Sequence, residues 1–258
     1  MDSVLTVLSE ECEQSHPALF DARRRRWWNR AQLQELVADI AGCLDCAQKS
    51  LAFCLCCNDV GSVAGYLAAI AAGHTVALFS ATTSGKNISK LLSLYEPTFL
   101  LCSEDGNKYM GSVSEHGYQS VRGGAGHTNI WCRKNTMTQD IHADLAVLLS
   151  TSGSTGSTKL VRLSAANLVS NAQAIAGTLG ISKTERAITS VPIEYAYGLS
   201  VLNSHLVSGA STVLTDANIL SSEFWDLCRS EGCTSFAGVP YTYSLLSTVD
   251  WEKLRVPR

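Results

Sequence analysis

Residues 145–159 read LAVLLSTSGSTGSTK, an apolar run followed at once by a polar loop that ends in a lysine. The run Leu145–Leu149 is short and continuous, which is typical of a strand buried on both faces of a parallel sheet. After the loop, apolar residues recur at helical spacing from about Ser164 to Leu179, and Gly180 is well placed to end that helix. The stretch therefore predicts a strand, a loop and a helix, the repeating unit of an α/β protein.

The same alternation continues on both sides of this unit. Upstream we expect the strands Leu51–Cys57, Thr75–Phe79 and Thr98–Cys102, separated by helices that end near Gly73 and before Pro97. Downstream we expect the strands Ala187–Val191, Thr212–Thr215 and Thr234–Ala237, the helices Leu199–Val207 and Ser221–Arg229, and Pro240 as the first residue of a last helix. The stretch from Asp105 to Gly126 is rich in Gly, Ser and Asn and predicts a long loop or insertion.

The predicted fold class is α/β, with mainly parallel sheets that carry helices on both faces. We expect two sheet-based subdomains. Residues 1–180 form the first and include the loop 150–159, and residues 181–258 begin a second subdomain that we interpret as truncated.

The loop has the composition and position of a phosphate-binding loop. Glycine lets the backbone approach a ligand closely, hydroxyls and backbone N–H groups bind phosphate oxygens, and a lysine meets their charge. The candidate ATP phosphate-binding residues are Thr151, Ser152, Gly153, Ser154, Thr155, Gly156 and Lys159. A Walker loop is excluded by spacing, because Thr158 stands where its second glycine is needed. A flexible Ser/Gly loop with no ligand is the alternative.

The string from Thr151 to Lys159 resembles the signature loop of the AMP-forming adenylating enzymes, Thr-Ser-Gly-Ser-Thr-Gly-x-Pro-Lys-Gly. That superfamily includes acyl-CoA synthetases, the adenylation domains of nonribosomal peptide synthetases and firefly luciferase. The chain departs from the pattern at Thr158, where proline is usual, and at Leu160, where glycine is usual. Further similar segments lie in the same order over roughly residues 20–250, so the resemblance covers most of the chain.

The resemblance also implies a pocket for a carboxylate substrate. Val191–Leu199 resembles the family segment PLFHVFGL, with Tyr195 where many acyl-CoA synthetases have histidine, and Phe236–Pro240 resembles a later strand end. The candidate pocket residues are Tyr195, Tyr197, Gly198 and Gly238. Their alternative role is that of ordinary core residues near a turn.

Membership of this superfamily implies the activation of a carboxylic acid as an acyl-adenylate, with ATP and Mg²⁺, and transfer to a thiol. The thiol belongs to coenzyme A or to the phosphopantetheine of a carrier protein. The family's later adenine-binding and ribose-binding motifs and its C-terminal lysine are not found, so we expect the 258 residues alone to be weak or inactive. Possible partners are a carrier protein or the missing C-terminal part. The alternative is a non-catalytic module that binds ATP or another protein.

Composition excludes other classes of function. A net charge of -3 gives no positive field for nucleic acid or anionic lipid, and Arg23–Arg26 with Trp27 and Trp28 predicts a solvated strand or hairpin. The absence of a signal peptide or membrane span predicts a cytoplasmic protein. The chain has ten cysteines, including the pair Cys43 and Cys46 in an expected helix Gln32–Ala47. We interpret these as small buried thiols and expect no metal site, with zinc as the alternative.

Overall fold

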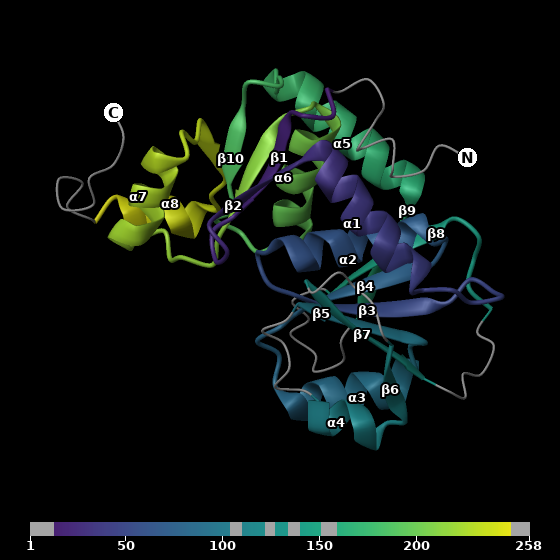
Figure 1. Ribbon diagram of the computed structural model, residues 1–258. Coiled ribbons are helices and arrows are strands. Elements are labelled where there is room, and N and C mark those ends of the chain that lie inside the picture. The colour runs from purple at the N-terminus through teal and green to yellow at the C-terminus, as the bar shows by residue number, and fades with distance from the viewer. Residues whose placement is uncertain (1–12, 104–109, 122–126, 134–139, 151–158, 249–258) are drawn as a thin grey trace.

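The computed structural model describes residues 13–103, 110–121, 127–133, 140–150 and 159–248, and within these ranges the strands form two sheets (Figure 1). The large sheet has the strand order β6-β7-β5-β3-β4-β8-β9, and the small sheet has the order β12-β10-β11-β1-β2. The strands of the large sheet are β3 Leu51–Cys56, β4 Thr75–Ser80, β5 Phe99–Ser103, β6 Tyr118–Val121, β7 Thr128–Arg133, β8 Leu145–Ser150 and β9 Leu160–Ser164. The strands of the small sheet are β1 Pro17–Asp21, β2 Arg26–Asn29, β10 Arg186–Ile188, β11 Ser211–Leu214 and β12 Ser235–Phe236.

The central strands of both sheets run parallel. In the large sheet β3 pairs in parallel with β4 and β5, and β4 with β8; in the small sheet β11 lies parallel to both β1 and β10. Antiparallel pairs occur toward the edges, as in β8 with β9 and β1 with β2. All residues of β3 are buried, as expected for a parallel strand that is covered on both faces. The predicted α/β class with mainly parallel sheets is confirmed.

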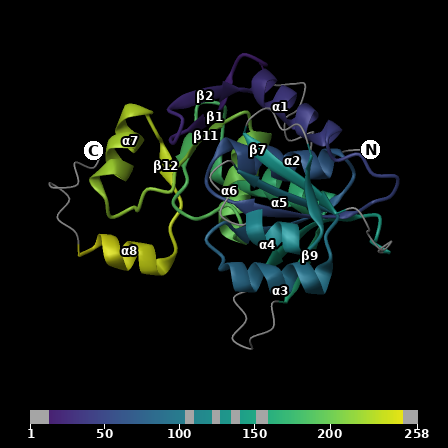
Figure 2. The ribbon, with the colours of Figure 1, turned by 60° about the horizontal axis from the view of Figure 1, so that its bottom comes forward.

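The helices of the described residues form three layers around the two sheets (Figures 1 and 2). The middle layer, between the sheets, consists of α1 Arg30–Gly42, α2 Val60–Ala71, α5 Ala165–Leu179 and α6 Ala196–Val207. The outer face of the large sheet is covered by α3 Gly85–Tyr95 and α4 Met110–Glu115. The outer face of the small sheet packs against α7 Ser222–Ser230 and α8 Pro240–Leu246. Each sheet therefore buries both of its faces, which removes the hydrophobic side chains of the central strands from water.

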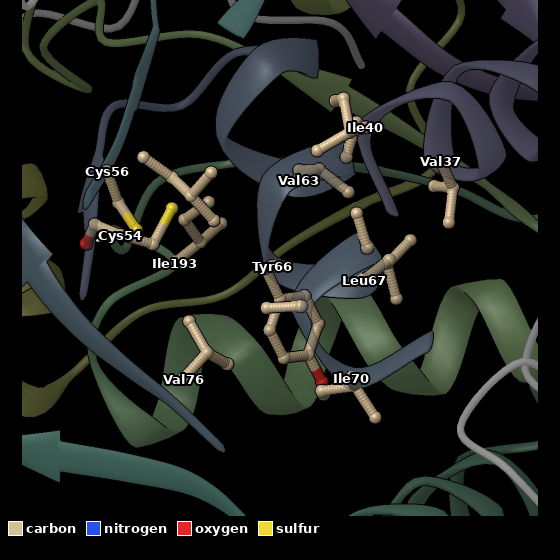
Figure 3. Close-up of a cluster of buried hydrophobic side chains, with 14 of the residues drawn as sticks. Val37, Ile40, Cys54, Cys56, Val63, Tyr66, Leu67, Ile70, Val76 and Ile193 are labelled. Atoms are coloured by element: carbon tan, nitrogen blue, oxygen red, sulfur yellow. Dashed lines mark hydrogen bonds between the residues drawn. The ribbon is translucent and has the colours of Figure 1, made fainter. Parts of the chain in front are cut away.

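Helix α2 is the centre of the middle layer. Every residue from Val60 to Ile70 is buried, and its alanines and glycines allow the helix to lie close to the strands. Figure 3 shows Val63 and Leu67 of this helix directed toward Ile40 of α1. Tyr66, on the same helix, belongs to the same buried cluster. The Tyr66 ring is fully buried and its hydroxyl lies 3.2 Å from Nδ2 of Asn203 in α6, so the polar end of this side chain is satisfied inside the core.

Local sequence signals place the ends of several helices. Helix α1 begins with a capping box in which Asn29 and Gln32 exchange side-chain to backbone hydrogen bonds. Asp59 caps α2 by accepting from the backbone N–H of Ser62 at 2.9 Å. Gly180 ends α5 in the left-handed conformation with φ of 65°, as its position after Leu179 predicted. Pro240 is at the start of α8, which also agrees with the prediction.

Three expectations about local structure were wrong. A strand, β9, lies between the Ser/Thr/Gly loop and α5, so the loop joins two antiparallel strands and does not lead directly into a helix. The stretch from Asp105 to Gly126 contains α4 and β6 within its described part. Helix α1 ends at Gly42, so Cys43 and Cys46 follow the helix and do not belong to it.

The two sheets do not follow one another along the chain. Strands β1 and β2 come from the N-terminal end but pair in the small sheet, where β1 lies beside β11 (Figure 1). The division into residues 1–180 and 181–258 stays a prediction. Arg23–Arg26 lie in and just before β2, at the tip of the β1–β2 hairpin, as the prediction of a strand or hairpin for these basic residues implies.

The cysteines for which the structure gives a state are free thiols, and those of β3 and β5 are buried. Among the residues with described positions, no group of three or more His, Cys, Asp or Glu side chains is arranged to hold a metal ion. In the same residues, no helix is long and apolar enough to cross a membrane.

Candidate functional site

The candidate phosphate-binding loop is held by a β-hairpin. Strands β8 and β9 are antiparallel, and Ser150 pairs with Leu160 at the end of the ladder. Lys159, which immediately precedes β9, is exposed to solvent. The other candidate residues of this loop, Thr151, Ser152, Gly153, Ser154, Thr155 and Gly156, lie outside the described residues.

A cavity of about 770 Å³ opens between α5 and α6, next to the strands that carry this loop. The apolar part of its wall is formed mainly by Leu149, Leu163, Leu168 and Leu199. The polar part is formed by Asn167, Ser170, Asn171, Ser200 and Asn203. Leu149 is the residue before Ser150 in β8, so the cavity begins directly beside the end of the strand where the loop starts. A pocket with an apolar wall and a few amides and hydroxyls is typical of a small-molecule site.

The polar residues of the cavity are fixed by contacts between helices. Ser200 Oγ donates to Asn171 Oδ1 at 3.2 Å and therefore joins α6 to α5. Asn203 contacts the buried Tyr66 hydroxyl of α2, as described above. Each carboxamide has more hydrogen-bonding capacity than these contacts use. None of the described residues that line the cavity carries a charge, so its wall suits an uncharged group.

The predicted substrate segment forms the turn that leads into α6. Tyr195 is the N-cap residue of this helix, with no side-chain hydrogen bond to the first turn. The Tyr195 and Tyr197 side chains are 51% and 45% exposed, whereas Gly198 is buried. The cavity is lined by Ala196 between the two tyrosines, and the tyrosines themselves do not line it. The assignment of Tyr195, Tyr197 and Gly198 to a substrate pocket stays a prediction.

Gly198 is required by the shape of this turn. A Cβ atom at this position would lie 2.2 Å from the carbonyl oxygen of Pro192 and 2.6 Å from that of Val191. Real Cβ atoms do not approach backbone atoms this closely, so any larger residue would push α6 away from the segment before it.

Gly238 belongs to a second segment at the same end of the small sheet. Strands β10 and β12 are parallel neighbours, and the Ser190 hydroxyl, which follows β10, donates to the carbonyl oxygen of Ala237. Gly238 therefore lies close in space to the segment that contains Tyr195. A side chain at Gly238 would contact the Tyr243 ring of α8, with a Cβ to Cε2 distance of 2.8 Å. The structure thus brings both predicted substrate segments to the carboxyl ends of parallel strands, where ligands bind in open α/β sheets.

A chain of polar contacts runs from the buried Asn58, behind the substrate segment, to an ion pair at the surface. Asn58, in the turn between β3 and α2, accepts from the backbone N–H of Ile193 at 3.3 Å and donates its own backbone N–H to Asp216 at 3.1 Å. Asp216 also forms an ion pair of 2.6 Å with Arg23 in the β1–β2 turn. Sequence analysis missed Asn58 and Asp216, because a single polar residue at the end of a strand has no pattern that distinguishes it from other turn residues.

Two acidic side chains close to these contacts are buried. Glu194, inside the substrate segment, is 5% exposed, and burial raises the pKa of its carboxyl group. Asp59 is fully buried at the start of α2, and burial is again the largest cause that raises its pKa, with its hydrogen bonds to Ser62 acting in the opposite direction. In the family segment PLFHVFGL the residue at the position of Glu194 is phenylalanine, so this carboxyl group is a departure that the motif itself reveals.

Comparison with known proteins agrees with the fold and with the motif. The sequence matches the AMP-binding enzyme family over residues 9–256. It is 36% identical over 104 residues to the acyl-CoA synthetase ALT10 of Alternaria alternata, which covers 40% of this chain and 18% of that protein.

Solved structures of the same fold include MatB from Rhodopseudomonas palustris, in its apo form and with ATP bound. The apo form has a TM-score of 0.76 at 20% identity over 95% of this chain and 50% of MatB. The ATP-bound form has a TM-score of 0.76 at 21% identity with the same coverage. The inhibitor-bound N-terminal domain of FACL13 from Mycobacterium tuberculosis has a TM-score of 0.76 at 15% identity, over 97% of this chain and 66% of that domain. The chain spans about half the length of MatB. It belongs to the AMP-binding enzyme family.

Proposed function

We propose that this chain provides the ATP-phosphate-binding and acid-binding part of an AMP-forming carboxylate ligase. One observation carries the proposal: the strand that leads into the phosphate loop and the helix that follows the substrate segment line the same cavity, through Leu149 on one side and Ala196 and Ser200 on the other. A ligase of this kind must bring a triphosphate and a carboxylate together, and a cavity lined by both of these elements supports the proposal.

The hairpin is suited to hold the triphosphate. Lys159 is exposed, immediately precedes β9 and follows the hydroxyl-rich residues 151–158 in the sequence. In the reaction that we propose, a carboxylate oxygen of the acid attacks the α-phosphorus of ATP, and the bond to pyrophosphate breaks. Lys159 acts by neutralising charge on the departing pyrophosphate and takes no part in proton transfer.

Magnesium would add to this neutralisation by bridging phosphate oxygens, as it does in other ATP-dependent enzymes. The buried side chains of Asp59 and Glu194 are not suited to bind this ion, because burial favours their protonated forms.

The cavity between α5 and α6 is suited to hold the acyl part of the acid. Its leucines offer apolar contacts, and Asn171 and Ser200 offer hydrogen bonds to an oxygen atom along the acyl chain. The acyl-adenylate would then pass to a thiol, of coenzyme A or of a carrier-protein phosphopantetheine, as the family resemblance implies.

The second candidate is a module that binds ATP without turnover. Its support is the length of the chain, which spans about half of MatB. In that case ATP binds to the hairpin and the catalytic step requires a further polypeptide.

Acid-dependent exchange of labelled pyrophosphate into ATP tests the proposal. The 258-residue protein is assayed with a panel of fatty, aryl and hydroxylated acids, and ATP binding is measured in parallel by calorimetry. Exchange with at least one acid supports the ligase; ATP binding without exchange supports the binding module; the absence of ATP binding contradicts both.

A pair of variants tests the cavity. Ala174→Phe fills the space between α5 and α6, while Gln173→Phe adds the same ring to an exposed position of α5 that does not line the cavity. We expect only Ala174→Phe to weaken binding of the acid. Equal effects of the two substitutions would contradict the assignment of the cavity.

A further inference from the structure

Ile193, in the middle of the substrate segment, is anchored at two points. Its side chain is 1% exposed and lies beside Cys54 and Cys56 of β3 in the central core (Figure 3). Its backbone N–H donates to Oδ1 of Asn58 at 3.3 Å. The hydrophobic contact fixes where the segment lies, and the hydrogen bond fixes the orientation of the peptide group that begins the turn.

Asn58 is itself buried and hydrogen-bonded. It is 6% exposed, and its backbone N–H donates to Asp216 Oδ1 at 3.1 Å. Asp216 in turn forms the 2.6 Å ion pair with Arg23 at the surface, where the two side chains are 41% and 34% exposed. The anchor of Ile193 is therefore part of a chain of contacts that joins the β1–β2 turn, the end of β11 and the start of α2.

The orientation of Ile193 is transmitted to α6 over a very short distance. The backbone N–H of Tyr195 donates to the carbonyl oxygen of Pro192 at 3.1 Å, and that of Leu199 donates to Tyr195 at 2.9 Å. Gly198 packs directly against the carbonyl oxygen of Pro192. A shift at Ile193 is therefore expected to move the start of α6, whose first two turns carry Ala196 and Ser200 of the cavity.

We propose that Asn58 is a positioning residue for the acid: its carboxamide, through Ile193, sets the geometry of the turn that presents the first residues of α6 to the cavity. This proposal rests on the proposed function of the cavity. Asn58 does not line the cavity and acts only through the backbone of the substrate segment.

The test compares Asn58→Leu, which keeps the shape but removes the acceptor, with Asn58→Asp, which keeps an acceptor oxygen. Asn58→Ala serves as a second variant without the acceptor if the leucine does not fold. The control is Ser211→Ala, which removes another buried side-chain hydrogen bond, the 2.8 Å contact to the carbonyl oxygen of Pro17, away from the segment.

Hydrogen exchange read by mass spectrometry gives the first measurement, and it does not depend on any activity. We expect exchange of the segment 191–198 to become about tenfold faster in Asn58→Leu, as follows from the loss of one buried hydrogen bond, and to remain near wild type in Asn58→Asp and Ser211→Ala. Unchanged exchange of this segment in both Asn58→Leu and Asn58→Ala would overturn the proposal.

Binding of the acid and of ATP gives the second measurement. We expect Asn58→Leu to raise Kd for the acid about tenfold and to leave Kd for ATP within about twofold, with recovery in Asn58→Asp. If Asn58→Leu weakens the binding of ATP as much as that of the acid, Asn58 has only a general structural role and the proposal is overturned. The same holds if Ser211→Ala weakens the binding of the acid as much as Asn58→Leu does. If wild type binds none of the acids, the proposed function fails, while the exchange measurement still decides whether Asn58 anchors the turn.

Discussion

Ser150 and Leu160 lie opposite each other in the antiparallel ladder of β8 and β9, so the two ends of the candidate phosphate loop are brought together at one edge of the large sheet. The strands at the two ends of the loop are joined by backbone pairing of the ladder. Substitutions within the loop should therefore change what it binds more than they change the stability of the sheet.

The first prediction concerns Lys159 at the end of this loop. Lys159→Ala removes a positive charge next to the proposed phosphate site, and a hydrogen bond to a charged group contributes about 1.5–3 kcal/mol. We expect Kd for ATP to rise about tenfold to a hundredfold, measured by calorimetry. Lys90→Ala, an exposed lysine of α3 on the far side of the large sheet, is the control. An ATP affinity that Lys159→Ala leaves unchanged would refute the role of the loop.

The second prediction concerns Gly198. Gly198→Ala forces a Cβ atom toward the carbonyl oxygen of Pro192, and we expect it to lower the free energy of unfolding by about 2 kcal/mol or more. Gly177→Ala in α5 is the matched control, because a Cβ atom there meets nothing within 4 Å. In an exposed helix interior this change should stabilise the protein by about 1 kcal/mol. Chemical denaturation measures the free energy of unfolding of both variants. If Gly198→Ala and Gly177→Ala change it equally and in the same direction, the described packing of the turn is contradicted.

The third prediction concerns Arg30, which is fully buried in the first turn of α1. Its Nη2 atom donates to the carbonyl oxygens of Leu206 at 3.1 Å and Ala210 at 3.3 Å, at the C-terminal end of α6. A positive charge at this end of a helix is favourable, and its loss removes a charged donor from two buried carbonyl oxygens.

Arg30→Met should therefore reduce the free energy of unfolding by about 3 kcal/mol, measured by denaturation in urea. Arg229→Ala breaks the exposed pair with Asp226 in α7 and should change stability by about 0.5 kcal/mol or less. If Arg30→Met lowers the free energy of unfolding no more than Arg229→Ala does, the buried contact contributes little to stability.

The fourth prediction is a pH dependence that arises from Glu194. Burial raises the pKa of this carboxyl group above its ordinary value of 4.5, so the folded state binds its proton more tightly than the unfolded state does. The protonated carboxyl group of Glu194 is the form that the folded state accommodates. Its contribution to the free energy of unfolding is therefore complete below pH 4.5 and is lost as the pH rises through the pKa of the folded state.

Glutamine does not ionise, so Glu194→Gln removes this pH-dependent loss of stability. Tm of the variant should therefore rise relative to wild type as the pH increases from about 4.5 to 8. Glu35→Gln, at an exposed position of α1, should show no such trend. Thermal denaturation across this pH range checks the prediction. A Tm difference for Glu194→Gln that is constant or that falls with pH would contradict it.

Much of the fold could be predicted because the central strands and helices have regular patterns. The continuous apolar runs in β3 and β8 and the helical spacing before Gly180 each correspond to an element in the structure. Strand β9 was missed because Leu160–Ser164 is short, only partly buried and directly follows a loop of Ser, Thr and Gly. Its pairing with β8 is a tertiary contact that local sequence does not encode.

The site was predicted less completely, for a related reason. The motif located the hairpin loop and the start of α6, which lie on either side of the cavity. Asn58, which contacts the substrate segment from the turn between β3 and α2, is separated from those motifs by many residues. Its role depends on the packing of that turn against the substrate segment, and in its own local sequence it is an ordinary polar residue.

The pairing of β1 with β11 has a consequence for how the protein forms. Leu19 lies beside Thr212. The β1–β2 hairpin is therefore synthesised about 190 residues before β11, the strand that pairs with β1. Until then the hydrogen-bonding edge of β1 remains open to other strands. We therefore expect folding of the small sheet to be the slow step, and nascent chains that stop before Ser211 to aggregate more readily than longer ones.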